Sequence, residues 1–422
     1  MGDGKLSLTY QLQKGEIMEY RLVTRCRICK SSELEKYLDL GKTPLVNKLP
    51  KSTSEHLERY PLEVLFCKEC ALSQLSVVVN PEVLYASNYP YYSSVSNTFR
   101  EHCNKLAITL KDMLPMIKHP YGNEHVTVTD IASNDGCLLE EFRKEGFVVS
   151  GFEPCKELAD VARMKLIGVV NDFFTEESAK RYLSSRHFVT ATNVFAHVDD
   201  VQDFLRGIPH MLDKNGVLVI EVPYLVDMIQ KNEFDTIYHE HLSYFLLKPL
   251  VRLFRDCGIP IFKVEKLDIH GGSIRIYASQ TSYEKHESVD KMLKEESGYH
   301  HISAYYDFRR QVRIVIDNLT ELLESLNNQN KKVVGYGASA KGVNLMNYCN
   351  LTTHDLHAVI DETPAKQGCY IPSCNIPIVP FEEFGKPDYI LLLAWNFSKE
   401  LMEKTKHLGA KYIIPIPKVE IV

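Results

Sequence analysis

Four of the eleven cysteines stand in two pairs of identical spacing, Cys26-Arg-Ile-Cys29 and Cys67-Lys-Glu-Cys70. A Cys-x-x-Cys turn directs two thiolates at one ion, and a second such turn completes a tetrahedral shell of four sulfurs around zinc. A redox motif needs one pair at a helix start, so the double pair favours zinc. Because sulfur fills all four ligand positions, we expect a structural zinc that substitutes for a core that this short segment can hardly build.

A second reactive set lies in the stretch FDTIYHEHLSYF at 234–245, which contains Tyr238, His239, Glu240, His241 and Tyr244. His241 is a candidate general base because an imidazole titrates near neutral pH. Glu240 could orient or polarise it, and a tyrosine hydroxyl could donate to a developing oxyanion. Two other interpretations stay open. His239 and His241 could ligate a metal, although no motif such as HExxH supplies a third ligand, or the histidines belong to an exposed helix start.

A nucleotide-cofactor unit precedes this stretch. VTVTDIASNDG at 126–136 is an apolar strand that ends in a small, polar turn, and a helical pattern and the strand FVVSGFEP follow it. Such a turn presents backbone N–H groups to a ligand, and the acid that ends the second strand can accept from ribose hydroxyls. The expected cofactor residues in this unit are Asp130, Ala132, Asn134, Gly136 and Glu153.

The elements that follow keep the order expected of such a unit. VNDFF places Asp172 in the loop after a third strand, where it could hold an adenine amino group. HFVTATNVFAHVDD is a fourth strand that runs into a polar loop with Asn193, and LDKNGVLVIEVPYL is a long apolar fifth strand. The series resembles the class I S-adenosylmethionine methyltransferases, although Ala132 and Asn134 replace two glycines of their first motif. The alternative is an unspecified Rossmann domain that uses NAD.

The C-terminal third predicts a second Rossmann-like unit. A long amphipathic helix at 308–330 precedes KVVGYGASAKGVNLMNY, which is a buried strand, a turn and a helix. The backbone nest of this turn, together with Ser339 and Lys341, suits a pyrophosphate. Asp361 lies 24 residues beyond Gly337, close to the spacing of a ribose-binding acid, so an NAD site stays possible. A purely scaffolding domain is the further alternative.

Taken together, the four cysteines, the methyltransferase core, the YHEH stretch and the last unit resemble the sugar-nucleotide 3-C-methyltransferases of deoxysugar biosynthesis. The match runs in order over nearly the whole chain after about residue 20. By this resemblance the catalytic residues are Tyr91 of YPYYSS, His197 of NVFAHV, and Tyr238, Glu240 and His241. The family's HGG segment and nearby arginine fall on His270, Gly271, Gly272 and Arg275, which would bind substrate. His239 occupies an unspecified position of the motif and is expected to be indirect or incidental.

The resemblance also implies a mechanism. A ketone at C4 of the sugar acidifies the C3 proton, and His241 removes it. Donors aimed at the ketone oxygen stabilise the enolate, and Tyr238, Tyr91 and His197 are the candidates. The carbon then attacks the sulfonium methyl in line, and this chemistry needs no metal.

These elements predict an α/β chain of three parts: a zinc-binding module at 20–82, a methyltransferase domain at 83–300 and a Rossmann-like substrate domain at 301–422. The formal net charge of −6 argues against binding to nucleic acid or an anionic membrane. The N-terminus lacks a signal-peptide pattern and no stretch reaches membrane-spanning length, so we expect a cytoplasmic protein, and the resemblance suggests a monomer. An O- or N-methyltransferase and a non-catalytic zinc-knuckle adaptor are the competing functions. Neither the nucleotide nor the sugar can be read from the sequence.

Overall fold

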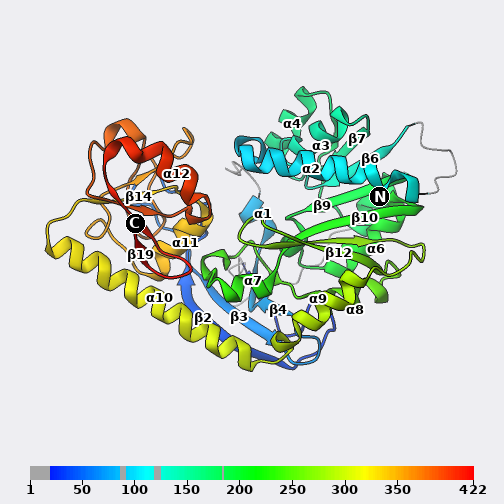
Figure 1. Ribbon diagram of the computed structural model, residues 1–422, viewed down its shortest axis with the longest axis horizontal. Coiled ribbons are helices and arrows are strands. Elements are labelled where there is room, and N and C mark those ends of the chain that lie inside the picture. Colours follow the sequence, from blue (N-terminus) through cyan, green and yellow to red (C-terminus); the bar gives the residue numbers. More distant parts are fainter. Residues whose placement is uncertain (1–19, 86–91, 118–124, 183–184) are drawn as a thin grey trace, which may run out of the picture.

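The structure is a computed structural model that describes residues 20–85, 92–117, 125–182 and 185–422. These residues form a two-stranded, a four-stranded, a six-stranded and a seven-stranded sheet. In Figure 1 the two largest sheets lie toward opposite ends of the long axis, and the strands β2 to β4 lie between them at the lower edge. The molecule therefore has two α/β lobes that are bridged by its N-terminal strands.

Four cysteine sulfurs organise the N-terminal part. These Sγ atoms all lie within 4.8 Å of one another, and they belong to Cys26, Cys29, Cys67 and Cys70. Each pair sits in a tight turn, in which Lys30 N donates to the Cys26 carbonyl at 3.0 Å and Ala71 N donates to the Cys67 carbonyl at 2.8 Å. Tetrahedral zinc at about 2.3 Å from each sulfur would separate the sulfurs by about 3.8 Å, so the set fits the predicted zinc site.

The sheet beside these cysteines recruits a strand from much later in the chain. Its order is β11-β4-β3-β2 and all its pairs are antiparallel. The bounds are β2 Leu34–Thr43, β3 Tyr60–Cys67, β4 Ser73–Leu75 and β11 Ser243–Tyr244. A separate ladder pairs β1 Tyr20–Leu22 with β5 Val77–Val79. Because β11 belongs to the stretch that carries Glu240 and His241, the cysteine-bound sheet is joined directly to the predicted catalytic residues.

The seven-stranded sheet has the order β12-β13-β10-β9-β6-β7-β8, and only β13 runs antiparallel to its neighbours. Its strands are β6 Thr127–Ile131, β7 Val148–Phe152, β8 Gly168–Val170, β9 Arg186–Thr192, β10 Leu212–Pro223, β12 Ile261–Leu267 and β13 Ser273–Ala278. This is the class I methyltransferase sheet that the sequence predicted. The strand order reverses between β6 and β9, and ligands of open α/β sheets bind outside the carboxyl ends of the strands at such a point.

Helices cover both faces of this sheet, as parallel strands buried on both sides require. The helices of this part of the chain are α2 Asn97–Met113, α3 Cys137–Lys144, α4 Lys156–Met164, α5 Glu176–Arg181, α6 Val201–Met211, α7 Leu225–Gln230, α8 Leu247–Asp256 and α9 Glu287–Glu295. The short helix α1, Pro81–Tyr85, packs instead beside Leu45, Tyr60 and Val79 of the N-terminal part. Among the described residues, no helix combines the length and the hydropathy that a membrane span needs.

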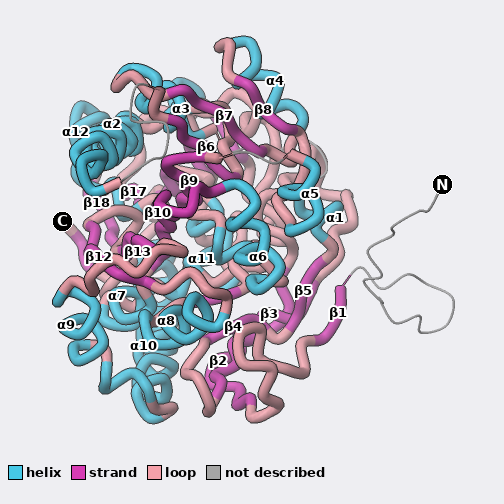
Figure 2. Tube along the Cα trace, turned by 90° about the vertical axis from the view of Figure 1, so that its right-hand side faces the viewer, coloured by secondary structure: helices cyan, strands magenta, loops and turns pink. Residues whose placement is uncertain are grey.

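The second lobe is also a parallel sheet, with the order β16-β15-β14-β17-β18-β19 and an antiparallel last strand. Its elements are β14 Val333–Tyr336, α11 Ala340–Tyr348, β15 Val359–Ile360, β16 Ile378–Val379, β17 Tyr389–Leu392, α12 Ser398–Thr405, β18 Lys411–Ile414 and β19 Glu420–Ile421. The predicted amphipathic helix is α10, Ser303–Asn328, which buries one side from Tyr305 to Leu326. Figure 2 shows α10 beside β2, so this helix connects the second lobe to the N-terminal sheet.

The four-sulfur site generates a direct prediction. Cys67→Ser should abolish binding of about one zinc per chain and lower the melting temperature, because the N-terminal sheet loses the ion that holds its turns together. Cys257→Ser is the matched control, since this half-buried thiol lies outside the cluster. Metal analysis and thermal unfolding measure both effects. Full zinc content in Cys67→Ser would contradict the assignment.

Candidate functional site

The turn after β6 adopts the conformation of a glycine-rich turn although two of its glycines are replaced. Ala132 and Asn134 have φ values of 58° and 52°, and Gly136 has a φ of 80°. The left-handed conformation costs a residue other than glycine about 1–2 kcal/mol, and asparagine tolerates it best. The two replacements therefore preserve the backbone path of the motif at some cost in strain. At Gly136 a Cβ atom would lie 2.8 Å from Ile167 Cδ1, so the third position requires glycine.

Glu153 closes this turn from the end of β7. Its Oε2 accepts from Asn134 N at 2.8 Å and its Oε1 accepts from Cys155 N at 2.9 Å. Burial raises the pKa of Glu153, and the two amide donors oppose that shift. Asp130 lies deeper, where it accepts from Thr190 Oγ1 at 2.6 Å and burial raises its pKa to about 7. Glu153 is thus the acid at the ligand edge, and Asp130 ties β6 to β9.

The remaining predicted cofactor residues lie at the same edge of the sheet. Asp172, in the loop after β8, is partly exposed and pairs with Arg181 at 2.9 Å. Asn193 follows β9 with a φ of 57°, and its N–H donates to the Glu221 carbonyl at 2.9 Å. The structure therefore gathers the residues predicted from β6, β7, β8 and β9 along one edge of the sheet.

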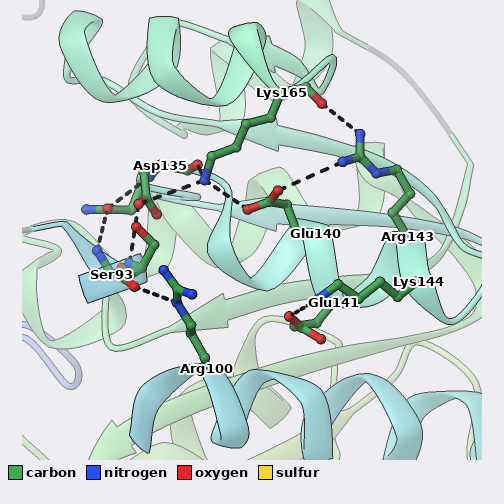
Figure 3. A network of polar contacts seen from close by, with 10 residues as sticks. Ser93, Arg100, Asp135, Glu140, Glu141, Arg143, Lys144 and Lys165 are labelled. Atoms are coloured by element: carbon green, nitrogen blue, oxygen red, sulfur yellow. Dashed lines mark hydrogen bonds and ion pairs between the residues drawn. The ribbon is translucent and has the colours of Figure 1, made fainter. Parts of the chain in front are cut away.

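The segment before α2 packs onto the cofactor turn. Ser93 N donates to Asn134 Oδ1 at 3.0 Å, and Ser94 N donates to Asp135 Oδ2 at 3.3 Å. Figure 3 shows Asp135 between Ser93 and Lys165, whose Nζ donates to the Asp135 carbonyl at 2.8 Å. This segment continues YPYYSS, so the sequence motif and the turn are neighbours in space. Tyr91 itself lies outside the described residues.

His241 lies in a cluster of rings with Tyr238 and His197. The ring centroids of Tyr238 and His241 are 4.0 Å apart, and those of His197 and His241 are 4.9 Å apart. His197 ends the short helix η3, Phe195–His197, after β9. The structure thus brings together three of the residues that the resemblance assigns to catalysis.

The protonation state of His241 follows from its neighbours. Its Nδ1 lies 2.7 Å from the Thr236 carbonyl oxygen, and because a carbonyl only accepts, Nδ1 carries the proton and Nε2 the lone pair. Burial lowers the pKa of His241 well below its ordinary value, and the charge of Lys341 acts in the same direction. A neutral imidazole with a free Nε2 is the form that accepts a proton.

His197 is held in a neutral form as well. Its Nδ1 lies 3.1 Å from the hydroxyl of Tyr85, at the end of α1. Burial lowers the pKa of His197 to about 4. A neutral imidazole can donate one N–H to a developing oxyanion without competing with His241 for a proton.

Glu240 and His239 both face the N-terminal part. Glu240 is 2% exposed, and its Oε1 accepts from Asn47 Nδ2 at 2.7 Å. His239 Nε2 lies 3.2 Å from the Pro61 carbonyl, and its ring packs edge-on against Tyr60. His239 thus anchors the stretch to β3. The metal interpretation of this stretch finds no support, since the four cysteines are the only group within ligand distance of a common ion among the described residues.

The HGG segment is shaped by two buried acids. His270 has a φ of 54°, and a Cβ atom at Gly271 or at Gly272 would overlap the carboxylate of Glu233 or of Asp227. Both glycines are therefore required by close approach as well as by their positive φ. Burial, together with the charges of Lys341 and His102, lowers the pKa of His270 to about 4.

Arg275 lies inside the seven-stranded sheet. Its Nε donates to Glu221 Oε1 at 2.6 Å, and its side chain is 6% exposed. The other oxygen of Glu221 contacts His102 Nε2 at 2.7 Å. This ion pair joins β13, β10 and α2, so the direct partner of Arg275 is Glu221.

The turn between β14 and α11 of the second lobe lies near Glu233, just before the stretch that contains His241. Ser339 caps α11, where its Oγ accepts from Gly342 N at 3.2 Å. Lys341 Nζ lies 3.5 Å from Glu233 and 5.1 Å from the ring centroid of Trp395. Asp361 accepts from the turn amide Ala338 N at 2.8 Å, which repeats the relation of Glu153 to its own turn.

Further contacts from the second lobe hold the residues just before Tyr238. Asn344 Nδ2 donates to the Asp235 and Ile237 carbonyls at 2.9 and 2.6 Å. Trp395 Nε1 donates to Asp235 Oδ2 at 2.7 Å, and the Tyr348 hydroxyl donates to the Ile237 carbonyl. Sequence reasoning missed Asn47, Tyr85, Asn344 and Trp395, because each contacts a part of the chain that is distant in sequence.

Comparisons with known proteins divide the chain in the same order. A putative zinc binding domain matches residues 26–85, a methyltransferase domain matches 99–263, and a C-methyltransferase C-terminal domain matches 268–417. C-methyltransferase NovU of Streptomyces niveus is 33% identical over 417 residues, which are 95% of this chain and 97% of that protein.

Two solved structures each match less than half of the chain. Magnesium protoporphyrin IX methyltransferase of Synechocystis PCC 6803, with bound S-adenosylmethionine, is 10% identical with a TM-score of 0.33 and covers 43% of this chain and 79% of its own. The PH0226 protein of Pyrococcus horikoshii is 12% identical with a TM-score of 0.34 and covers 45% of this chain and 95% of its own.

The contacts of α11 predict that the second lobe controls the rate of methyl transfer. Asn344→Ala leaves the buried carbonyls of Asp235 and Ile237 without this donor, so it should cost about 2 kcal/mol in stability and lower kcat about tenfold. Asn347→Ala is the matched control on the same helix, since Asn347 donates to Val343 and Pro372 instead. Melting temperatures and kcat separate the two effects. Equal kcat losses in both variants would contradict the prediction.

Proposed function

Since the chain belongs to the family of S-adenosylmethionine-dependent C-methyltransferases, we propose that it transfers the methyl group to C3 of a nucleotide-linked 4-keto-deoxysugar. Membership of this family favours carbon over oxygen or nitrogen as the accepting atom. It also favours catalysis over the role of a zinc-knuckle adaptor.

One observation carries the proposal: a neutral His241 with Nε2 free to accept a proton, next to Tyr238 and His197. Methylation at carbon requires the loss of a C–H proton, and a neighbouring ketone is what makes such a proton acidic enough for an imidazole. Methylation at a hydroxyl group needs no ketone. A buried neutral base with candidate oxyanion donors beside it therefore supports enolate chemistry.

In the proposed reaction His241 Nε2 takes the C3 proton, and the electrons of that bond move toward the ketone oxygen at C4. Tyr238, His197 and Tyr91 are the proposed donors to this oxygen. Glu240 is the proposed acid that orients or polarises His241. S-adenosylmethionine, when bound, would supply the electrophilic methyl group to C3 and would keep the electron pair of its sulfur–methyl bond as it leaves.

The cofactor residues we propose are Asp130, Ala132, Asn134, Gly136, Glu153, Asp172 and Asn193. Each Glu153 oxygen accepts one backbone N–H and keeps a further lone pair for a ribose hydroxyl. The positive φ values of Ala132, Asn134 and Gly136 give the turn the tight backbone path of a nucleotide-binding turn at the carboxyl end of β6.

For the substrate we propose Lys341, Ser339, His270 and Arg275. The ammonium of Lys341 lies at the first turn of α11, where charge and helix dipole together favour a phosphate. Ser339 contributes by capping that turn, and Arg275 contributes through Glu221. His270 lies across the site on the HGG loop, where the charge of Lys341 reaches it.

A panel of nucleotide-linked sugars tests the proposal. Incubation with S-adenosylmethionine should add one methyl group to 4-keto sugars, and mapping should place it on the carbon next to the ketone. The matching sugars reduced to the 4-hydroxyl should give no product. Equal methylation of the reduced sugars would contradict the proposal.

The base is tested separately. His241→Ala should retain S-adenosylmethionine affinity, measured by calorimetry, and should lose about 10²–10⁴-fold in kcat. His239→Asn is the neighbouring control, because that imidazole faces Pro61 and Tyr60, and it should retain most of the rate. Full activity of His241→Ala would remove His241 as the base.

A further inference from the structure

We propose that Asn47, in the cysteine-bound part of the chain, is a positioning residue that holds the Glu240 carboxylate in the catalytic site. The contact is a hydrogen bond of 2.7 Å from Asn47 Nδ2 to Glu240 Oε1. The inference rests on the proposed function, in which Glu240 acts beside His241. It gives the N-terminal part a role in catalysis beyond the binding of zinc.

Asn47 is carried on a backbone that is fixed on both sides. It follows β2, and the two preceding residues, Leu45 and Val46, are 5% and 3% exposed. Leu45 packs in a cluster with Tyr60, and Val46 packs in the main core. A little further on, the Pro50 carbonyl accepts from Tyr370 N of the second lobe at 2.8 Å. A side chain on such a rigid support loses little entropy when it holds one orientation.

The partner of the Glu240 carboxyl in this contact is a neutral amide. Glu240 is 2% exposed, and burial alone favours the neutral acid. A neutral amide donor stabilises the carboxylate through a hydrogen bond without cancelling its charge, whereas a lysine or an arginine would neutralise it. Asn47 therefore gives the Glu240 carboxyl a fixed direction without placing a positive charge beside it.

Glu240 is also connected to the imidazoles of the site. Burial and, after it, the charge of Glu240 raise the pKa of Tyr85 well above its ordinary value, which keeps its hydroxyl protonated. That hydroxyl lies 3.1 Å from His197 Nδ1, and His197 packs against His241. A displacement of Glu240 would thus be felt at Tyr85 and at both imidazoles, although Asn47 is not assigned any contact with substrate.

Two substitutions distinguish positioning from packing. Asp has nearly the shape of Asn but replaces the donor by a second carboxylate, whereas Ala removes the donor and adds no charge. We expect kcat to fall about tenfold in Asn47→Ala and about a hundredfold in Asn47→Asp, with KM for S-adenosylmethionine within about twofold of the unsubstituted enzyme. A packing role predicts the reverse order, because the isosteric Asp would then be the milder change.

Asn80→Asp provides the matched control. Asn80 lies in the same part of the chain and accepts from Glu82 N at 3.0 Å, so Asp preserves its bond, and kcat should not change. Zinc content and melting temperature show whether each variant is folded. An unchanged kcat in Asn47→Asp, or a smaller fall in kcat there than in Asn47→Ala, would overturn the inference. The rate of the unsubstituted enzyme on 4-keto sugars, measured in the same series, reports on the proposed function alone.

Discussion

The stretch around His241 is mostly buried and contains almost no regular secondary structure, so its backbone polar groups must find partners outside any helix or sheet of its own. Those partners come from three directions. Asn344 of the second lobe binds the Asp235 and Ile237 carbonyls, Leu75 N of β4 binds the Leu242 carbonyl, and Leu242 N binds the carbonyl of Ala196. The conformation of this stretch is therefore set by all three parts of the chain together.

The N-terminal part and the second lobe therefore both hold the stretch around His241 in position. The cysteine turns hold the sheet in which β11 is an edge strand, and Asn47 of the same part binds Glu240. On the other side, α11 and Trp395 fix the residues that lead into Tyr238, and Lys341 approaches Glu233. A structural zinc and a second Rossmann-like sheet can thus affect the position of His241 without contacting it.

Much of this arrangement was predictable from local patterns. The paired Cys-x-x-Cys turns, the order of the strands and the amphipathic helix α10 each depend on residues close together in sequence, and the structure confirms all three. Ala132 and Asn134 looked like departures from the motif, because sequence alone does not show that both adopt the left-handed conformation of the glycines they replace.

Contacts between residues that are distant in sequence could not be predicted from local patterns. Arg275 was expected at the substrate, and only the pairing of β13 with β10 reveals Glu221 as its partner. The direction of His239 depends on where β3 passes, and the contact of Asn47 with Glu240 depends on a fold that joins residues 193 positions apart. In each case the deciding interaction is tertiary, and no local spacing encodes it.

In the proposed reaction His241 creates a carbon nucleophile next to a ketone. Hydrogen exchange at C3 of a nucleotide-linked 4-keto sugar in deuterated water, with S-adenosylhomocysteine in place of the methyl donor, tests it most directly. We expect deuterium at C3 with the unsubstituted enzyme and exchange slowed to the uncatalysed rate in His241→Gln. Undiminished exchange in His241→Gln would contradict it.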